Sequence, residues 1–172
     1  EMQRSLVGSE MCIRDRSHAD EWKINPNKVG IMGASAGGHL ASTAATHYDN
    51  ETKPAFQILL YPVISMDPSI SHGGSRKNLL GDSPSGNLIN KYSNELQVTQ
   101  NTPPAFIALS SDDRTVPPAN SIRYYEALIA NKVPTTMHIY PIGGHGWGFR
   151  DAFTYKPQWT GELEKWLREL NK

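Results

Sequence analysis

The sequence predicts an α/β fold, a mostly parallel sheet flanked by helices. First, a short apolar strand at 28–32 leads into an Ala- and Leu-rich helix at 38–46 and then a buried strand at 55–61. Strand, helix and strand in this order imply parallel strands joined by a right-handed crossover. Second, the same alternation returns later, as a strand at 104–110, a helix at 119–131 and a strand at 135–140.

The first sixteen residues lack the periodic apolar patterns of the rest of the chain. Residues 4–16 show no helical or strand period and are similar to a translated sequencing adapter. We therefore expect residues 1–16, with Cys12, to be non-native and to lie outside the fold. The alternative is an ordinary frayed N-terminal segment. Residues 17–172 then form part of a single domain, opening with the last turns of a helix at 17–22 and a turn at 24–27.

The remaining segments complete the pattern. Residues 63–102 are rich in Ser, Gly, Asn and Pro and carry only short apolar pieces, which is typical of a lid or a pocket wall. The C-terminal segment is predicted to be a helix whose apolar stripe packs on the sheet. That stripe consists of Trp159, Leu163, Trp166, Leu167 and Leu170.

Composition narrows the class of function. The chain has 172 residues, with 17 basic and 17 acidic side chains, so its balance of charge does not suggest a nucleic acid as partner. No apolar run approaches the roughly 18 residues that suggest a membrane span. The single cysteine excludes an internal disulfide, and no His, Cys or carboxylate cluster has the spacing of a metal site. We expect no metal and no cofactor.

One pentapeptide, Gly33-Ala34-Ser35-Ala36-Gly37, has the G-x-S-x-G spacing of a nucleophile elbow. It stands between a predicted strand and a predicted helix, which is the context that an elbow needs. Glycines at both ends would let the neighbouring backbone pass close to the turn. The alternative is a glycine-rich turn with a solvated serine.

A serine nucleophile needs a base beside it and a group that orients the base. Asp112 and Asp113 follow the strand that ends at Ser110, and His145 follows the strand that ends at Tyr140. Loops at the carboxyl ends of parallel strands lie at one edge of the sheet, where these residues can meet Ser35. The sequence therefore predicts a catalytic Ser-Asp-His set.

These motifs resemble those of the α/β-hydrolases. Asp113-Arg-Thr-Val-Pro117 is similar to their D-x-x-V-P acid loop, which favours Asp113 over Asp112 as the partner of His145. Residues 17–172 resemble bacterial carbohydrate esterases of the bifunctional feruloyl and acetyl esterase type, including acetylxylan esterases. The resemblance implies a serine esterase acting on plant polysaccharide, and the C-terminal portion of an α/β-hydrolase domain. The alternatives are a peptidase of the prolyl-oligopeptidase type and a catalytically silent domain.

Further expectations follow from that resemblance. The N–H of Ala36 should supply one oxyanion donor, while the upstream loop that normally supplies the other has no counterpart before Gly33. We therefore expect this chain to be poorly soluble and nearly inactive by itself. Trp147 is predicted to wall the substrate pocket or to anchor its loop in the core, and His39 to pack beneath the elbow. Oligomeric state stays open, and a periplasmic or secreted location is an expectation only.

Overall fold

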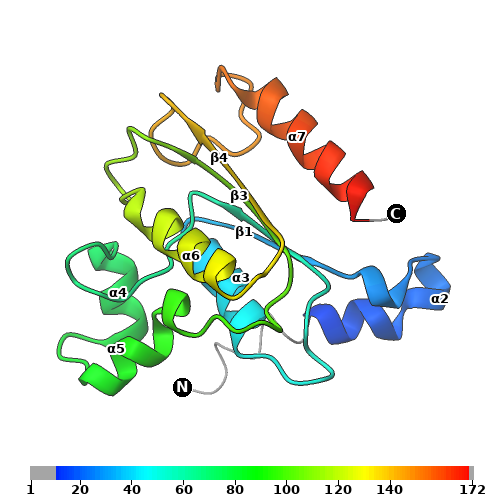
Figure 1. Cartoon of the computed structure of the whole chain (residues 1–172), viewed down its shortest axis with the longest axis horizontal. Coiled ribbons are helices and arrows are strands. Elements are labelled where there is room, and N and C mark those ends of the chain that lie inside the picture. Colours follow the sequence, from blue (N-terminus) through cyan, green and yellow to red (C-terminus); the bar gives the residue numbers. More distant parts are fainter. Residues whose placement is uncertain (1–10, 171–172) are drawn as a thin grey trace.

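The computed structural model describes residues 11–170. Within them a four-stranded parallel sheet has the order β1-β2-β3-β4, as predicted (Figure 1). Its strands are β1 (Ile31–Ala34), β2 (Gln57–Leu60), β3 (Ala105–Ser110) and β4 (Thr135–Tyr140). All six residues of β3 are buried, so the core of the domain is built around this strand.

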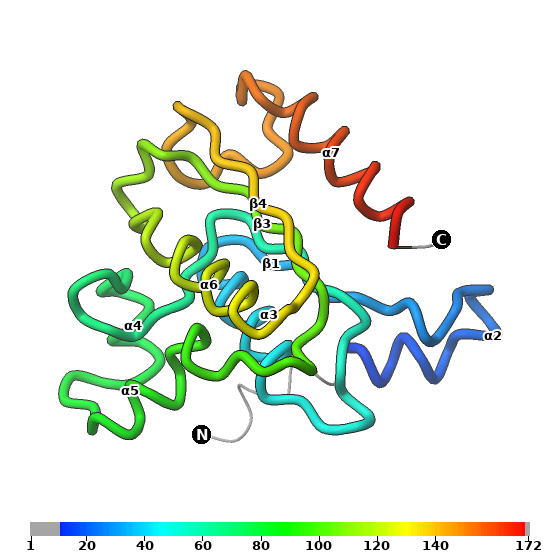
Figure 2. Tube along the Cα trace, viewed as in Figure 1, coloured from blue at the N-terminus to red at the C-terminus, as the bar shows by residue number. Residues whose placement is uncertain are grey.

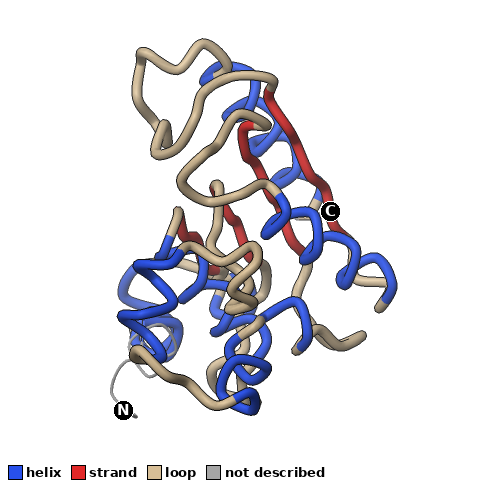
Figure 3. Tube along the Cα trace, turned by 90° about the vertical axis from the view of Figure 1, so that its left-hand side faces the viewer, coloured by secondary structure: helices blue, strands red, loops and turns tan. Residues whose placement is uncertain are grey.

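Helices cover both faces of the sheet, as Figure 3 shows. Alternate side chains of a strand point to opposite faces. Gln57 accepts a hydrogen bond from the Tyr124 hydroxyl of α6 (Ala119–Ala130), while its neighbour Phe56 packs edge-on against Trp166 of α7 (Lys156–Glu169). The two helices therefore lie on opposite faces, and α7 packs on the sheet through Trp159 and Leu163. At the end of the predicted stripe, Leu170 is exposed.

The segment 63–102 contains more regular structure than its composition predicts. It forms two short helices, α4 (Gly73–Leu80) and α5 (Gly86–Tyr92), and the 3-10 turn η2 (Asn94–Leu96), beside α6 (Figure 2). Neither helix has a fully buried residue. Their sequences therefore carry no apolar stripe from which a helix could be predicted. Local caps start both helices: the side chains of His72 and Ser85 accept hydrogen bonds from the first turns.

The N-terminal part is packed against the domain where it is described. Residues 11–17 are helical and are followed by α2 (Ala19–Trp22) and the 3-10 turn η1 (Pro26–Lys28). Cys12 is buried, and the Arg16 guanidinium binds the carbonyl oxygens of Glu51 and Pro26. Residues 1–10 of the segment predicted to be non-native lie outside the described residues.

Two element boundaries differ from prediction around the elbow. The first strand begins at Ile31 rather than residue 28, because Asn25 caps a turn that occupies 26–28. The following helix, α3 (Ala36–Thr46), begins two residues before the predicted Gly38. Ser35 is consequently the residue at which the strand ends and the helix starts.

Candidate active site

Ser35 adopts a conformation that side-chain-bearing residues rarely take. It lies between β1 and α3 with φ 55° and ψ −123°. Such strain persists only where the surroundings fix it. Here the Ser35 N–H donates to Leu60 O at 3.0 Å, and Ser35 O accepts from the N–H of Val63 at 3.0 Å. The last residue of β2 and the segment that follows it therefore hold the turn on both sides of the serine.

The glycines of the motif do not share one role. A Cβ on Gly33 would lie 2.1 Å from Gly37 O, so residue 33 must be glycine for α3 to approach the strand. A Cβ on Gly37 would meet nothing within 4 Å. The prediction that both glycines permit close approach is thus wrong for Gly37. Gly38 has that role instead, since its Cβ would lie 2.5 Å from Pro62.

The structure brings Ser35, His145 and Asp113 together. The imidazole Nε2 of His145 lies 2.7 Å from Ser35 Oγ, and its Nδ1 lies 2.6 Å from Asp113 Oδ2. A carboxylate only accepts hydrogen bonds, so Nδ1 carries the proton. Nε2 of the neutral ring is then left to accept the serine proton. This arrangement can activate a hydroxyl as a nucleophile.

The two adjacent aspartates have separate partners. Asp113 is buried, and its Oδ1 accepts from the N–H groups of Thr115 and Val116, both at 2.9 Å. These bonds fix the carboxylate that faces the imidazole. Asp112 is exposed and binds the backbone N–H groups of Gly143 and Gly144. Those hydrogen bonds, Gly144 first, lower the pKa of the Asp112 carboxyl.

Trp147 is part of the hydrophobic core of the described residues. It is 3% exposed, its indole N–H donates to Ser110 Oγ at 2.9 Å, and its ring stacks on Phe153 with centroids 4.2 Å apart. These contacts favour the core anchor over the pocket wall, and a contact of Trp147 with substrate stays a prediction. A large aromatic ring with one N–H donor fits both a pocket wall and the core, so the sequence alone did not distinguish these two environments.

Tyr61 belongs to the site but was missed by the sequence reasoning. Its ring packs edge-on against His145 with centroids 4.8 Å apart, and edge-on against Trp147 at the same separation. Burial raises the pKa of the Tyr61 hydroxyl, and a hydrogen bond with the Gly148 backbone opposes that shift. Tyr61 has φ 36°. Its place directly between a buried strand and Pro62 was the available signal.

Ala36 and His39 occupy the first turns of α3. The first N–H groups of a helix have no partner within it, so the exposed Ala36 can offer its N–H to an oxyanion. His39 is buried, and its Nε2–H donates to Tyr92 O at 2.8 Å. Burial lowers the pKa of His39. His39 is therefore a neutral structural residue beneath the elbow.

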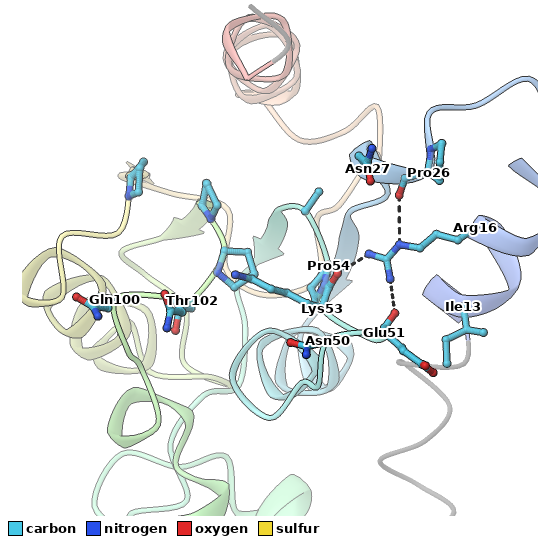
Figure 4. A pocket seen from close by; sticks show the side chains of 15 residues that line it. Ile13, Arg16, Pro26, Asn27, Asn50, Glu51, Lys53, Pro54, Gln100 and Thr102 are labelled. Atoms are coloured by element: carbon cyan, nitrogen blue, oxygen red, sulfur yellow. Dashed lines mark hydrogen bonds between the residues drawn. The ribbon is translucent and has the colours of Figure 1, made fainter.

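One hollow lies away from Ser35, at the opposite ends of the strands. It measures about 910 Å³ and is lined by segments preceding β2, β3 and β4, at the amino ends of the strands (Figure 4). Arg16 crosses it to bind backbone carbonyls, so its charge is already engaged. Among the described residues there is no cluster of metal-ligating side chains and no helix able to span a bilayer.

Comparison with known proteins places the chain in a family. The chain is 45% identical over 159 residues to an acetylxylan esterase of Xylanibacter ruminicola, covering 90% of this chain and 33% of that protein. An acetyl ester-xyloside bifunctional hydrolase from Caldicellulosiruptor lactoaceticus superposes with a TM-score of 0.93 at 36% identity, covering 97% of this chain and 65% of that one. A sugar hydrolase from Lactococcus lactis gives 0.81 at 30% identity, covering 98% and 68%. Residues 15–172 match the prolyl oligopeptidase family model, and the chain belongs to that family.

Proposed function

We propose that this protein is a serine hydrolase of carboxylic esters that removes acetyl or feruloyl groups from plant polysaccharide. The observation that carries the proposal is the continuous contact from Asp113 through His145 to Ser35, with distances of 2.6 and 2.7 Å. The names of the relatives, an acetylxylan esterase and an acetyl ester-xyloside hydrolase, support an acetylated sugar as the substrate.

The proposed mechanism follows from the proton positions. Ser35 Oγ attacks the ester carbonyl carbon while His145 Nε2 takes the hydroxyl proton, and Asp113 stabilises the imidazolium that forms. The Ala36 N–H donates to the oxyanion of the tetrahedral intermediate. Collapse expels the alcohol, which receives the proton from Nε2, and leaves an acyl group on Ser35. Water activated by His145 then releases the acid and restores the serine.

A fluorophosphonate probe tests the nucleophile directly. In a form extended to the length of its relatives, we expect mass spectrometry to find one probe on Ser35 and none in Ser35→Ala, with the same circular dichroism spectrum for both. The probe reports the reactivity of the serine without a full catalytic cycle. A folded extended form that stays unlabelled would contradict the mechanism.

Peptide hydrolysis is the second candidate, favoured by the family itself. Acetate release from acetylated xylan is therefore compared with cleavage of a proline-containing peptide. Both are measured on the 172-residue chain and on a form extended to the length of its relatives. Acetate release without peptide cleavage supports the esterase. The reverse result supports the peptidase, and labelling of Ser35 is expected in either case.

A further inference from the structure

Three consecutive residues at the end of β3 bind the segment that carries His145. Ser111 comes first: its hydroxyl donates to Pro141 O at 2.9 Å and lies 3.2 Å from Tyr140 O. The Ser111 N–H also donates to Tyr140 O, at 2.8 Å. Asp113 comes last and binds the imidazole itself. Between them, Asp112 binds the backbone N–H groups of the two glycines that precede the histidine.

The contact made by the Asp112 carboxylate is bidentate, with one hydrogen bond to each oxygen. Its Oδ1 accepts from the Gly144 N–H at 2.7 Å, and its Oδ2 accepts from the Gly143 N–H at 3.3 Å. Hydrogen bonds between a backbone N–H and an ionised carboxylate are among the stronger kinds in proteins. The low pKa of the Asp112 carboxyl, caused first by Gly144, agrees with this pairing.

The histidine segment needs such a restraint. Gly143, Gly144 and Gly146 have φ values of 151°, 59° and 80°, in regions that glycine enters with little cost. Glycine-rich backbone loses more conformational freedom on ordering than any other, so its geometry must be fixed by contacts. The side chain of Ile142 is 58% exposed and adds little packing on that side.

We propose that Asp112 is a positioning residue for His145. Its carboxylate fixes the backbone N–H groups of Gly143 and Gly144, so that the imidazole of His145 faces both Ser35 and Asp113. The proposal rests on the proposed function for its consequence in catalysis, while the restraint on the ring can be measured independently. Asp112 touches neither the serine nor the imidazole in any hydrogen bond of the described residues, so it acts through the loop.

The test uses two substitutions at Asp112 and one control. Asp112→Ala removes both acceptors, whereas Asp112→Asn keeps one carbonyl oxygen for Gly144. Asp151→Ala removes another exposed carboxylate that follows His145 and binds Lys156. NMR of the ¹⁵N-histidine-labelled chain follows the His145 Nδ1–H resonance and its exchange with water. The fluorophosphonate probe measures the labelling rate of Ser35.

We expect Asp112→Ala to broaden or lose the Nδ1–H resonance and to slow labelling about 10- to 100-fold, the scale set by small errors in catalytic geometry. Asp112→Asn should recover part of both, and Asp151→Ala should match the wild type. An unchanged resonance in a folded Asp112→Ala chain would overturn the proposal. If the wild type is not labelled even when it is extended to the length of its relatives, the proposed function fails, and the resonance alone decides the positioning role.

Discussion

The imidazole of His145 lies 2.7 Å from the hydroxyl of Ser35, although 110 positions separate them in the chain. Ser35 follows β1 and His145 follows β4, which are the two outer strands of the sheet described here. The contact therefore joins segments that follow strands at opposite edges of that sheet. A change that loosens either end should weaken it, even where no catalytic group is altered.

Asp113→Asn tests the orientation of the base. The amide oxygen can still accept from Thr115 and Val116, so the loop should keep its shape. The group that faces His145 Nδ1 then changes from a carboxylate oxygen to an amide NH₂, which donates a hydrogen bond. The imidazole therefore favours the tautomer with its proton on Nε2, which cannot accept the proton of Ser35. If the proposed function holds, we expect the rate of ester hydrolysis by an extended, active form to fall on the order of 10⁴-fold, which is the loss that this change causes in a Ser-His-Asp triad. A loss below tenfold, with the fold intact by circular dichroism, would argue that Asp113 does not orient the base.

Comparing Ser35→Gly with Ser35→Ala separates the backbone strain at residue 35 from the loss of the hydroxyl's contact with His145. Both remove the hydroxyl, but only glycine relieves the conformation at φ 55°. Strain of about 1–3 kcal/mol, less the extra entropy of glycine in the unfolded chain, should leave Ser35→Gly more stable by about 0.5–2 kcal/mol. Urea unfolding of the two variants measures the difference. Equal stabilities would mean that the strain in the turn is no larger than the entropic cost of glycine, which would contradict the expected strain of about 1–3 kcal/mol.

The sheet and its neighbouring helices could be predicted because local patterns and global packing agree there. α6 begins at the predicted residue 119, and the strands at 104–110 and 135–140 appear with boundaries shifted by one residue or less. The Asp113 and His145 contact required a resemblance and a strand-end argument as well. Each residue was identified by its loop, and the topology then brought the loops together.

What could not be predicted depends on contacts between distant segments. α4 and α5 bury no residue fully, so periodicity gave no sign of them. Trp147 had two reasonable environments, and its bond to Ser110 selects one. Asp112 looks like a solvated loop carboxylate in the sequence, because the glycines that it binds lie more than thirty positions away.

Asn120 should be essential to the acid loop and the 63–102 segment. Its Oδ1 accepts from the N–H groups of Ile64 and Ser65, and its Nδ2 donates to Ile70 O and Pro117 O. Asn120→Ala leaves these backbone groups without their partner in a buried place, which should cost about 3 kcal/mol or more. Asn131→Ala, at the other end of the same helix, should cost less than about 1 kcal/mol. Thermal or urea unfolding checks both, and similar losses would contradict the assignment.

Asp67 should make stability depend on pH. Hydrogen bonds from Ser69 and then from Arg123 lower the pKa of its carboxyl from 3.8 to about 2. The folded state thus favours the ionised form, and this stabilisation is complete above about pH 4 and is lost as the pH falls toward 2. Asp67→Asn should lower the unfolding free energy at pH 7 by about 0.5–1 kcal/mol, since the pair is partly solvated. The gap between variant and wild type should narrow in urea titrations at pH 4, 3 and 2.5. A constant gap would contradict the linkage.

Gly33 and Gly37 stand four positions apart in one motif but should respond oppositely to alanine. At Gly33 the new Cβ would lie 2.1 Å from a backbone oxygen of α3, so strand and helix must separate. We expect a loss of about 3 kcal/mol and slower labelling of Ser35, whose turn lies between them. At Gly37 the Cβ meets open space in the first turn of α3, and alanine should add about 0.5–1 kcal/mol through helix propensity. Urea unfolding of the two variants gives both values. A stable Gly33→Ala chain with normal labelling would show that the elbow tolerates a wider separation than this packing implies.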